Sequence, residues 1–246
     1  MEKNKKEISK QNKSMPREKK KDSVTVKANK KGKHINSFLN FLRILIIPIY
    51  WLIKPFRFYG KKKIPAGACV YVCNHFTMLD AAYVAATTWE QIHFIAKKEI
   101  EETFGLGFLA RKAKAIFATR DGNDIRTLLD CFKCLKNGEK IAVFPEGTRN
   151  KENEELLPFR HGAAAMAIKA KAPVLPMVIY NRPKMFRCTH ILVGDPIELT
   201  EYYDRKLTQT DYNEADEKLR SMLQTVRAEH TEYLKSRKNK KERGET

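Results

Sequence analysis

The sequence predicts one α/β domain with a mostly parallel central sheet flanked by helices, preceded by an N-terminal membrane-associated helical segment. Short apolar, β-prone runs end repeatedly at polar or charged groups, as strands do where they enter loops. Because ligands of open α/β sheets bind beyond the carboxyl ends of the strands, we expect these groups to converge. With 246 residues, 42% of them hydrophobic, the chain can bury a sizeable core. The runs and their end groups are residues 92–96 with Lys97, residues 115–119 with Arg120, and residues 140–145 with Glu146.

Charge divides the chain into a basic tail, a body and a second basic end, within a formal net charge of +19. Residues 1–36 hold thirteen Lys and Arg against four Asp and Glu and show no periodic apolar pattern, which predicts a disordered tail. Residues 216–246 predict a charged amphipathic helix that runs into a basic end. We therefore expect the globular domain over residues 59–215.

An apolar run over residues 38–53 separates the basic tail from the globular domain. As a helix it would span about 24 Å, less than the roughly 30 Å hydrocarbon core of a bilayer, and Arg43 and Pro48 interrupt it. A helix packed in the protein core is one interpretation. We instead expect residues 37–58 to lie in one leaflet, as a peripheral or monotopic attachment at the cytoplasmic face of the cell membrane. The basic residues that follow the run would face anionic lipid.

The first motif that carries chemistry is Asn74-His75-x4-Asp80. An imidazole can accept a proton near neutral pH, and a nearby carboxylate can orient the ring. Residues five apart on a helix are rotated by about 140° and do not share a face. His75 and Asp80 therefore meet only if a turn carries His75 and the next helix carries Asp80. The β-prone run 68–73 and the helix-like run 81–86 fit that arrangement, although the motif alone also fits a hydrogen-bonded loop histidine.

The second motif is Phe144-Pro145-Glu146-Gly147-Thr148-Arg149, which follows the strand-like run 140–143. It combines a backbone turn with a guanidinium, which are the parts needed to hold an anion. Taken with the first motif, it predicts a base beside a phosphate clamp.

In chain order, four blocks of this sequence resemble the four motifs of the glycerolipid acyltransferases, over about residues 38–200. The two motifs above are the specific part, and the other two blocks are looser. The chain departs from the family at Phe76-Thr77, where the family varies, and at Asn150, where a serine is common; both departures leave the acceptor open. The looser blocks are Phe117-x2-Arg120 and Val174-Leu175-Pro176.

This resemblance implies an enzyme that transfers an acyl group from acyl-CoA or acyl carrier protein to the free hydroxyl of 1-acyl-sn-glycerol 3-phosphate, forming phosphatidic acid in phospholipid biosynthesis. Glycerol 3-phosphate or another lysolipid is the alternative acceptor. A hydroxyl attacks poorly unless a base removes its proton, which typically contributes about 10²–10⁴-fold. The resemblance makes His75 that base and Asp80 its orienting carboxylate.

By the same resemblance, the other motif residues bind the substrate. Arg120 and Arg149 would clamp the acceptor phosphate, while Lys97 is either a further phosphate contact or a solvated lysine. Glu146 would either hydrogen-bond the glycerol or hold the arginines. The full expected set is Asn74, which fixes the loop, with Lys97, Arg120, Glu146, Gly147, Thr148, Arg149 and Pro176.

The five cysteines indicate a reducing compartment, because an odd number does not make a disulfide framework. Cys131-x2-Cys134 lies in a helix-like run without the flanking turns and further ligands of a zinc site, so we expect core thiols and no metal. No phosphate-cradling or dinucleotide glycine signature is present, so no cofactor is expected.

Two alternatives come from other classes of protein. The basic ends are typical of a nucleic-acid-binding protein, but they flank an apolar run without an aromatic platform or recognition helix, so no specific nucleic acid is expected. A non-catalytic lipid-binding protein is the second alternative, and His75 and Asp80 argue against it. The expected partners are the acyl donor, the lysophospholipid acceptor and an anionic membrane surface.

Overall fold

The computed structural model describes residues 35–60, 64–119, 125–151, 156–159 and 162–242, with side chains to Lys235. The predicted tail over residues 1–36 therefore lies outside the described residues, except for residues 35 and 36. Arg120 lies outside them as well. The elements in chain order are α2 (Ser37–Ile53), β1 (Phe56–Tyr59), β2 (Cys69–Cys73), α3 (Asp80–Ala85), β3 (Ile92–Lys97), α4 (Lys98–Glu101), α5 (Leu106–Lys112), β4 (Ile116–Ala118), α6 (Ile125–Lys136), β5 (Lys140–Val143), α7 (Ala163–Ala170), β6 (Val174–Ile179), β7 (Thr189–Val193), the 3₁₀ turn η2 (Thr200–Tyr202) and α8 (Gln209–Glu242).

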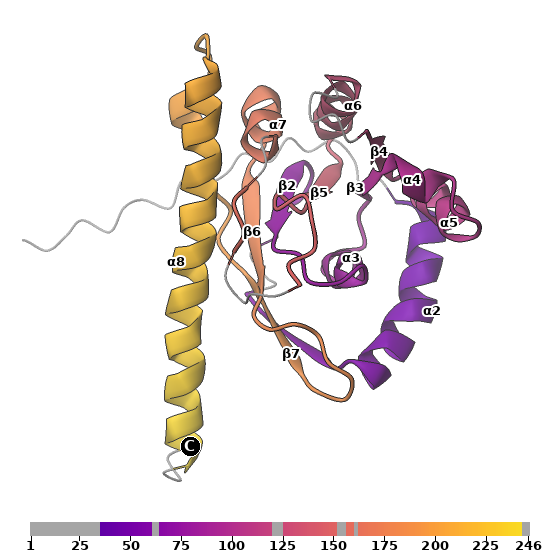
Figure 1. The fold of residues 1–246 in the computed structure, drawn as a ribbon, viewed down its shortest axis with the longest axis vertical. Helices are drawn as coiled ribbons and strands as arrows, with labels where there is room; N and C mark the ends of the chain where they lie inside the picture. The colour runs from indigo at the N-terminus through magenta and orange to yellow at the C-terminus, as the bar shows by residue number, and fades with distance from the viewer. Residues whose placement is uncertain (1–34, 61–63, 120–124, 152–155, 160–161, 243–246) are drawn as a thin grey trace, which may run out of the picture.

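The strands form one seven-stranded sheet in the order β1-β7-β6-β2-β5-β3-β4 (Figure 1). Every neighbouring pair is parallel except β6 and β7, which are antiparallel. The predicted α/β class with a mostly parallel sheet is therefore confirmed. The carboxyl ends of the neighbouring parallel strands β2, β5 and β3 point the same way, so the loops that follow these strands are neighbours.

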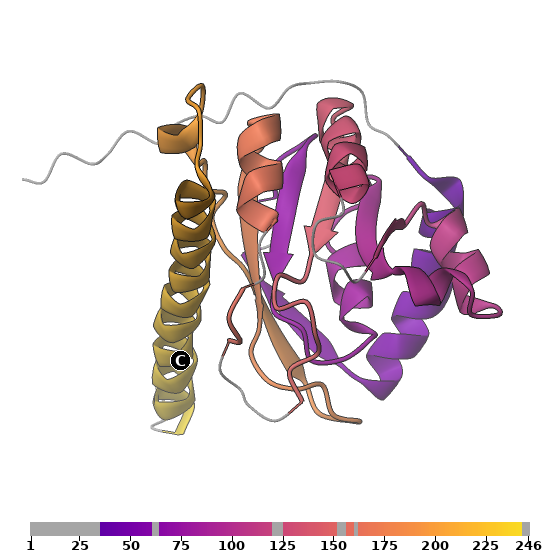
Figure 2. The same cartoon turned by 45° about the horizontal axis from the view of Figure 1, so that its top comes forward.

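Helices cover both faces of the sheet, so its central strands are apolar throughout rather than alternating. On β2, Val70 and Val72 pack into the core beneath α6, α7 and α8. The intervening Cys69, Tyr71 and Cys73 pack into the core formed with α3 and the end of α2. Figure 2 shows α6 and α7 side by side on their face, and α8 runs along the length of the molecule (Figures 1 and 2).

A buried arginine fixes α2 to the domain. Arg43 is 4% exposed and donates from Nε to the carbonyl of Ala85 at 2.8 Å, at the end of α3. Its terminal nitrogens donate to the carbonyls of Trp89 and Glu90 at 3.2 and 2.9 Å. A guanidinium suits this place because it meets several carbonyls at once, near the negative end of a helix. Burial lowers the pKa of Arg43 to about 10. The residue that interrupts the apolar run is thus the anchor of the helix.

The opposite face of α2 is apolar and exposed. No helix in the described part of the chain is long and apolar enough to cross a membrane. The exposed large side chains of α2 are Phe41, Ile44, Leu45, Ile46, Ile49, Trp51, Leu52 and Ile53.

Two predicted boundaries differ from the structure. The helix expected over residues 37–58 ends at Ile53, because Lys54 precedes Pro55 and a residue before proline disfavours helical angles. Residues 56–59 instead form β1, an edge strand paired with β7, so a boundary after residue 58 divides a strand. The C-terminal helix begins at Gln209 rather than at residue 216. Thr208 and Asp211 form a reciprocal capping box at its start, with hydrogen bonds of 2.7 and 3.3 Å.

Pro176 lies inside the sheet, paired with Val72 of β2, although a proline within a strand is usually found at the strand start or on an edge strand. Its carbonyl accepts a hydrogen bond from the N–H of Gly194 at 2.9 Å, and a Cβ on Gly194 would lie 2.8 Å from the proline ring. Pairing between β6 and β7 stops just beyond Pro176 and resumes at the isolated bridge between Val174 and Ile197. The missing N–H of proline falls in that interruption, where it costs no ladder hydrogen bond.

Candidate active site

His75 follows the carboxyl end of β2, and Asp80 is the first residue of α3. Nδ1 of His75 lies 3.0 Å from Oδ2 of Asp80; the Asp80 side chain is fully buried, while that of His75 is 17% exposed. An ionised carboxylate can only accept, so Nδ1 carries the proton and Nε2 of the neutral ring keeps its lone pair. Within the described residues, Nε2 has no hydrogen-bond partner. The ring is therefore oriented on one side and available on the other.

The turn between the two residues fixes Asp80. Its Oδ2 also accepts the N–H groups of Phe76 and Thr77 at 2.6 and 2.8 Å, and its Oδ1 accepts the Thr77 hydroxyl at 2.7 Å. These three hydrogen bonds hold the Asp80 carboxylate in one orientation. Sequence reasoning missed Thr77, although its spacing from Asp80 is that of a helix-start box and could have revealed it.

Glu146 joins the two motif loops. Its buried carboxylate accepts the N–H of His75 at 2.9 Å on Oε1 and the N–H of Leu157 at 3.2 Å on Oε2. Burial raises the pKa of Glu146, against the opposing effect of these N–H groups and of the His75 and Asn150 side chains. In the described structure the carboxylate thus holds the backbone of His75, and a contact with glycerol or with the arginines stays a prediction.

Two further residues of the second loop bracket His75, and sequence reasoning missed both. The Phe144 ring stacks on the imidazole, with centroids 4.2 Å apart and planes 20° apart. The N–H of Asn150 donates to the carbonyl of His75 at 2.7 Å. Because these contacts link positions some seventy residues apart, no local pattern signals them. They leave the His75 peptide fixed on both sides.

Asn74 fixes the loop from the side of β6. Its amide nitrogen donates to the carbonyl of Ile179 at 2.9 Å, and its amide oxygen accepts the N–H of Ile179 at 2.8 Å. The side chain continues the pairing of β2 with β6 beyond the last residue of the strand. The end of β6 thereby positions the residue next to the candidate base.

The expected phosphate-binding residues divide into two groups. Gly147, Thr148 and Arg149 form an exposed turn directly after Glu146, in which Gly147 has φ +63°, a conformation that glycine adopts readily. Lys97 is exposed at the carboxyl end of β3, at the same edge of the sheet. Arg120 lies outside the described residues. Pro176 is buried within β6 and is not brought to this surface.

Among the described residues, neither His75 nor Asp80 belongs to a group of three side chains that could hold a metal ion. The geometry supports proton transfer at Nε2 of His75, beside an exposed turn that carries a guanidinium.

Several known proteins are similar to this chain. The model of the acyltransferase family matches residues 55–180. A 1-acyl-sn-glycerol-3-phosphate acyltransferase of Helicobacter pylori is 38% identical over 122 residues, which cover 49% of this chain and 52% of that protein. The protein of the same name from Bacillus subtilis is 27% identical over 157 residues, covering 59% and 75%. A putative one from Caenorhabditis elegans is 30% identical over 203 residues, covering 76% and 69%.

A solved structure has the same fold. The crystal structure of the 1-acyl-sn-glycerophosphate (LPA) acyltransferase PlsC from Thermotoga maritima aligns with a TM-score of 0.61 at 24% identity, covering 80% of this chain and 79% of that one. The chain spans about half the length of the Helicobacter pylori relative. Because the family model matches just over half of the chain and includes both motif loops, the protein belongs to the acyltransferase family.

Proposed function

We propose that this protein transfers an acyl group from an acyl thioester to the free hydroxyl of 1-acyl-sn-glycerol 3-phosphate, which forms phosphatidic acid. The observation that carries the proposal is the pair of His75 and Asp80, held at 3.0 Å with Nε2 of the imidazole available. The names of the relatives from Helicobacter pylori and Bacillus subtilis supply the acceptor.

The chemistry needs one base and no nucleophile from the protein. Nε2 of His75 takes the proton of the acceptor hydroxyl while the hydroxyl oxygen attacks the thioester carbonyl. Asp80 keeps the proton on Nδ1 and stabilises the imidazolium that forms. When the tetrahedral intermediate collapses, the carbon–sulfur bond breaks and the imidazolium returns its proton to the leaving thiolate. The new ester and a free thiol are the products.

The acceptor phosphate is assigned to the turn after β5. Arg149 supplies a guanidinium, whose paired N–H groups match phosphate oxygens, and Gly147 lets the backbone approach closely. Lys97 at the end of β3 is a second cation at the same edge, and Arg120 is the third residue of this proposal. The donor is acyl-CoA or acyl carrier protein, whose thioesters have the same reacting bond.

The test is acyl transfer from a thioester in detergent, with lysophosphatidic acid, glycerol 3-phosphate and a zwitterionic lysolipid as parallel acceptors. We expect transfer to lysophosphatidic acid. We expect Arg149→Ala to raise the KM for that acceptor with little change in kcat, because the phosphate is remote from the reacting hydroxyl. Transfer only to glycerol 3-phosphate or to the zwitterionic lysolipid would make that molecule the acceptor in place of lysophosphatidic acid. No transfer to any of the three would refute the proposal.

We also propose that the outer face of α2 seats the protein on an anionic membrane surface, at the cytoplasmic face of the cell membrane. Its apolar side chains have the spread expected of a helix lying in the interface, and Lys54 and Arg57 follow at its end. Each basic residue near such a surface contributes about 1 kcal/mol. This location would bring the candidate active site, at the carboxyl ends of the strands, to a substrate that carries acyl chains.

Flotation with anionic vesicles tests this placement. We expect Ile44→Asp with Ile49→Asp to abolish binding, while Ile125→Asp on α6 keeps it; all three side chains are more than half exposed, so the fold should tolerate the changes. Binding of the wild type should persist in high salt because part of it is apolar. Equal flotation of the α2 variant and the control would contradict the placement, and binding to nucleic acid that falls steeply with salt would favour the alternative class.

A further inference from the structure

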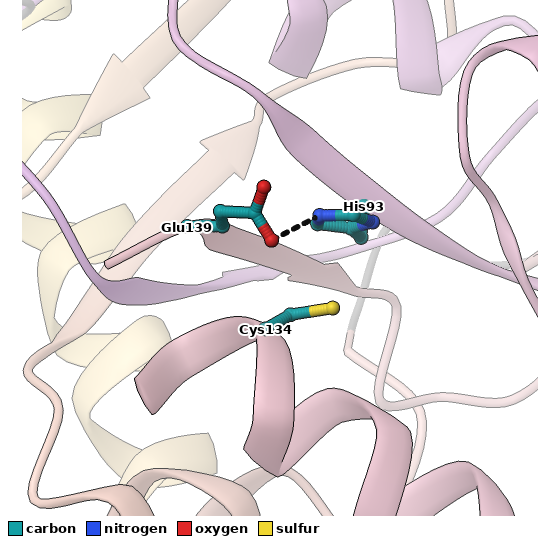
Figure 3. A group of neighbouring side chains, drawn as sticks. All are labelled: His93, Cys134 and Glu139. Atoms are coloured by element: carbon teal, nitrogen blue, oxygen red, sulfur yellow. Dashed lines mark hydrogen bonds and ion pairs between the residues drawn. The ribbon is translucent and has the colours of Figure 1, made fainter. Parts of the chain in front are cut away.

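Three side chains with metal-ligating atoms meet at the edge of the sheet opposite the candidate active site. His93 is the second residue of β3, Glu139 directly precedes β5, and Cys134 lies on α6. Their ligand atoms all lie within 4.8 Å of one another, and they make up the one such group of three among the described residues. Figure 3 shows the Cys134 side chain below the pair of His93 and Glu139, with its sulfur beneath His93.

The protons of His93 are fixed by its neighbours. Nδ1 lies 2.8 Å from the carbonyl oxygen of Lys114, which can only accept, so Nδ1 carries the proton. Nε2 lies 3.0 Å from Oε2 of Glu139. A neutral ring would therefore direct its lone pair at a carboxylate. Either a second proton or a cation must lie between these two atoms.

A second proton would explain two of the three groups, as an imidazolium paired with a carboxylate. The thiol of Cys134 also hydrogen-bonds Glu139, so all three groups meet at one carboxylate, where a single cation would bind all of them at once. Burial raises the pKa of the Cys134 thiol to about 11, as is usual for a thiol in apolar surroundings. Its partner in the Cys-x2-Cys pair, Cys131, faces the core and is 0% exposed, so the pair itself is not a ligand set.

The surroundings of His93 are those of a metal-ligating histidine. Such residues donate their second ring N–H to a carbonyl or carboxylate, which fixes the ring and the tautomer. Here the carbonyl belongs to Lys114, a residue with φ +58° that ends α5 in a left-handed cap. The His93 and Glu139 side chains are 6% and 10% exposed, while Cys134 is partly buried.

We infer that His93 Nε2, Cys134 Sγ and the Glu139 carboxylate form a zinc site with three protein ligands and a fourth position for water. Imidazole, thiolate and carboxylate together suit Zn²⁺, whereas Mg²⁺ and Ca²⁺ take oxygen ligands. The thiol gives up its proton when the metal binds. Because β3 and β5 are parallel to β2, the site lies at the amino ends of the strands, away from His75. The metal would join β3, β5 and α6 and would act on stability rather than on acyl transfer.

The test is a titration of the full chain, stripped with a chelator, with Co²⁺ as an absorbing substitute for Zn²⁺. We expect one equivalent to bind and to give the near-ultraviolet charge-transfer band of a thiolate–cobalt bond. Cys134→Ser should remove the band and weaken binding by at least about tenfold, which is the smallest loss typical even of an outer-shell change. Cys188→Ser, which alters an exposed cysteine, should leave both unchanged.

Thermal unfolding gives a readout that needs no thiolate band. Zinc should raise the midpoint of the wild type in proportion to the logarithm of its concentration, and it should do so much less in His93→Gln. Circular dichroism would confirm that each variant is folded before titration. No band and no shift of the midpoint would overturn the inference and leave an ion pair of His93 and Glu139. A charge-transfer band that survives Cys134→Ser would also overturn the inference, because the metal would then be bound by another cysteine.

Discussion

Two histidine–carboxylate pairs with the same nitrogen–oxygen distance lie at opposite ends of the strands of one sheet. His75 and Asp80 are 3.0 Å apart at the carboxyl ends of the strands, and His93 and Glu139 are 3.0 Å apart at the amino ends. The difference lies in the second ring nitrogen. In His75 that nitrogen has no described partner and the side chain is 17% exposed, whereas in His93 it donates to a carbonyl and the side chain is 6% exposed.

The comparison teaches that a carboxylate partner does not by itself make a histidine a base. A general base needs one oriented nitrogen and one that a substrate can reach. His75 meets both conditions. Both ring nitrogens of His93 have partners, so His93 can only bind a metal ion or form an ion pair with Glu139. A third case is His230 of α8, whose two ring nitrogens are buried without a hydrogen-bond partner in the described structure.

The largest effect on activity is expected from a change to Asp80, the carboxylate that orients His75. Asp80→Asn should lower kcat by about 10²–10⁴-fold, because an amide can donate to Nδ1 and stabilise the wrong tautomer of His75. The acceptor KM should change little. Steady-state kinetics of the folded variant would measure both, and a kcat close to that of the wild type would contradict the orienting role.

Breaking the other pair should affect folding and spare catalysis. His93→Gln should lower the free energy of unfolding by about 3 kcal/mol, since the variant removes the imidazole that pairs with the mostly buried carboxylate of Glu139. Its kcat, measured below the unfolding transition, should stay close to that of the wild type. Urea unfolding in the presence of a chelator gives the stability without a metal contribution. A loss of kcat without a loss of stability would show that the two edges are coupled.

Glu146 sharpens the account of how His75 is held. Glu146→Gln would place an amide NH₂ against the N–H of either His75 or Leu157, so one of the two hydrogen bonds is lost. We expect kcat to fall about tenfold, which corresponds to about 1.4 kcal/mol, with the KM for the acceptor unchanged. Arg149→Ala is the matched contrast, because it should change KM alone. A rise in KM for Glu146→Gln would instead support the predicted contact with the glycerol.

The smallest effect concerns His230 and pH. Burial, followed by the nearby charge of His190, lowers the pKa of His230 below its ordinary value of 6.5. As the pH falls below that value, the unfolded chain takes up a proton that the folded chain does not, so the free energy of unfolding decreases toward acid. The midpoint of thermal unfolding should fall between about pH 7.5 and about pH 5.5, and it should fall less in His230→Phe. Equal falls would remove His230 from the cause.

Much of the sheet and both motif loops could be predicted because their signals are local. The apolar run before Asn74 became β2, and the helix expected after it begins at Asp80, with the turn that the spacing of His75 and Asp80 requires. The edge strand β1 could not be predicted in this way. The sequence places β1 in the predicted membrane segment, because its four residues continue an apolar and basic stretch and its partner β7 comes more than a hundred residues later.

Contacts between distant segments could not be predicted from one sequence. The carboxylate of Glu146 meets a backbone N–H seventy-one residues earlier in the chain, and no residue pattern encodes that meeting. Arg43 looked like an interruption because the carbonyls that receive it lie beyond α3. His93, Cys134 and Glu139 share no motif, since each comes from a separate element and only the sheet brings them together.

The most direct test measures the rate of acyl transfer from a thioester to lysophosphatidic acid for the wild type, His75→Gln and His93→Gln side by side. All three proteins are first shown to be folded at the assay temperature. The account predicts that His75→Gln loses about 10²–10⁴-fold in rate while His93→Gln keeps the rate of the wild type. Undiminished transfer by His75→Gln would contradict it, because the oriented histidine with the available nitrogen would then not be the base.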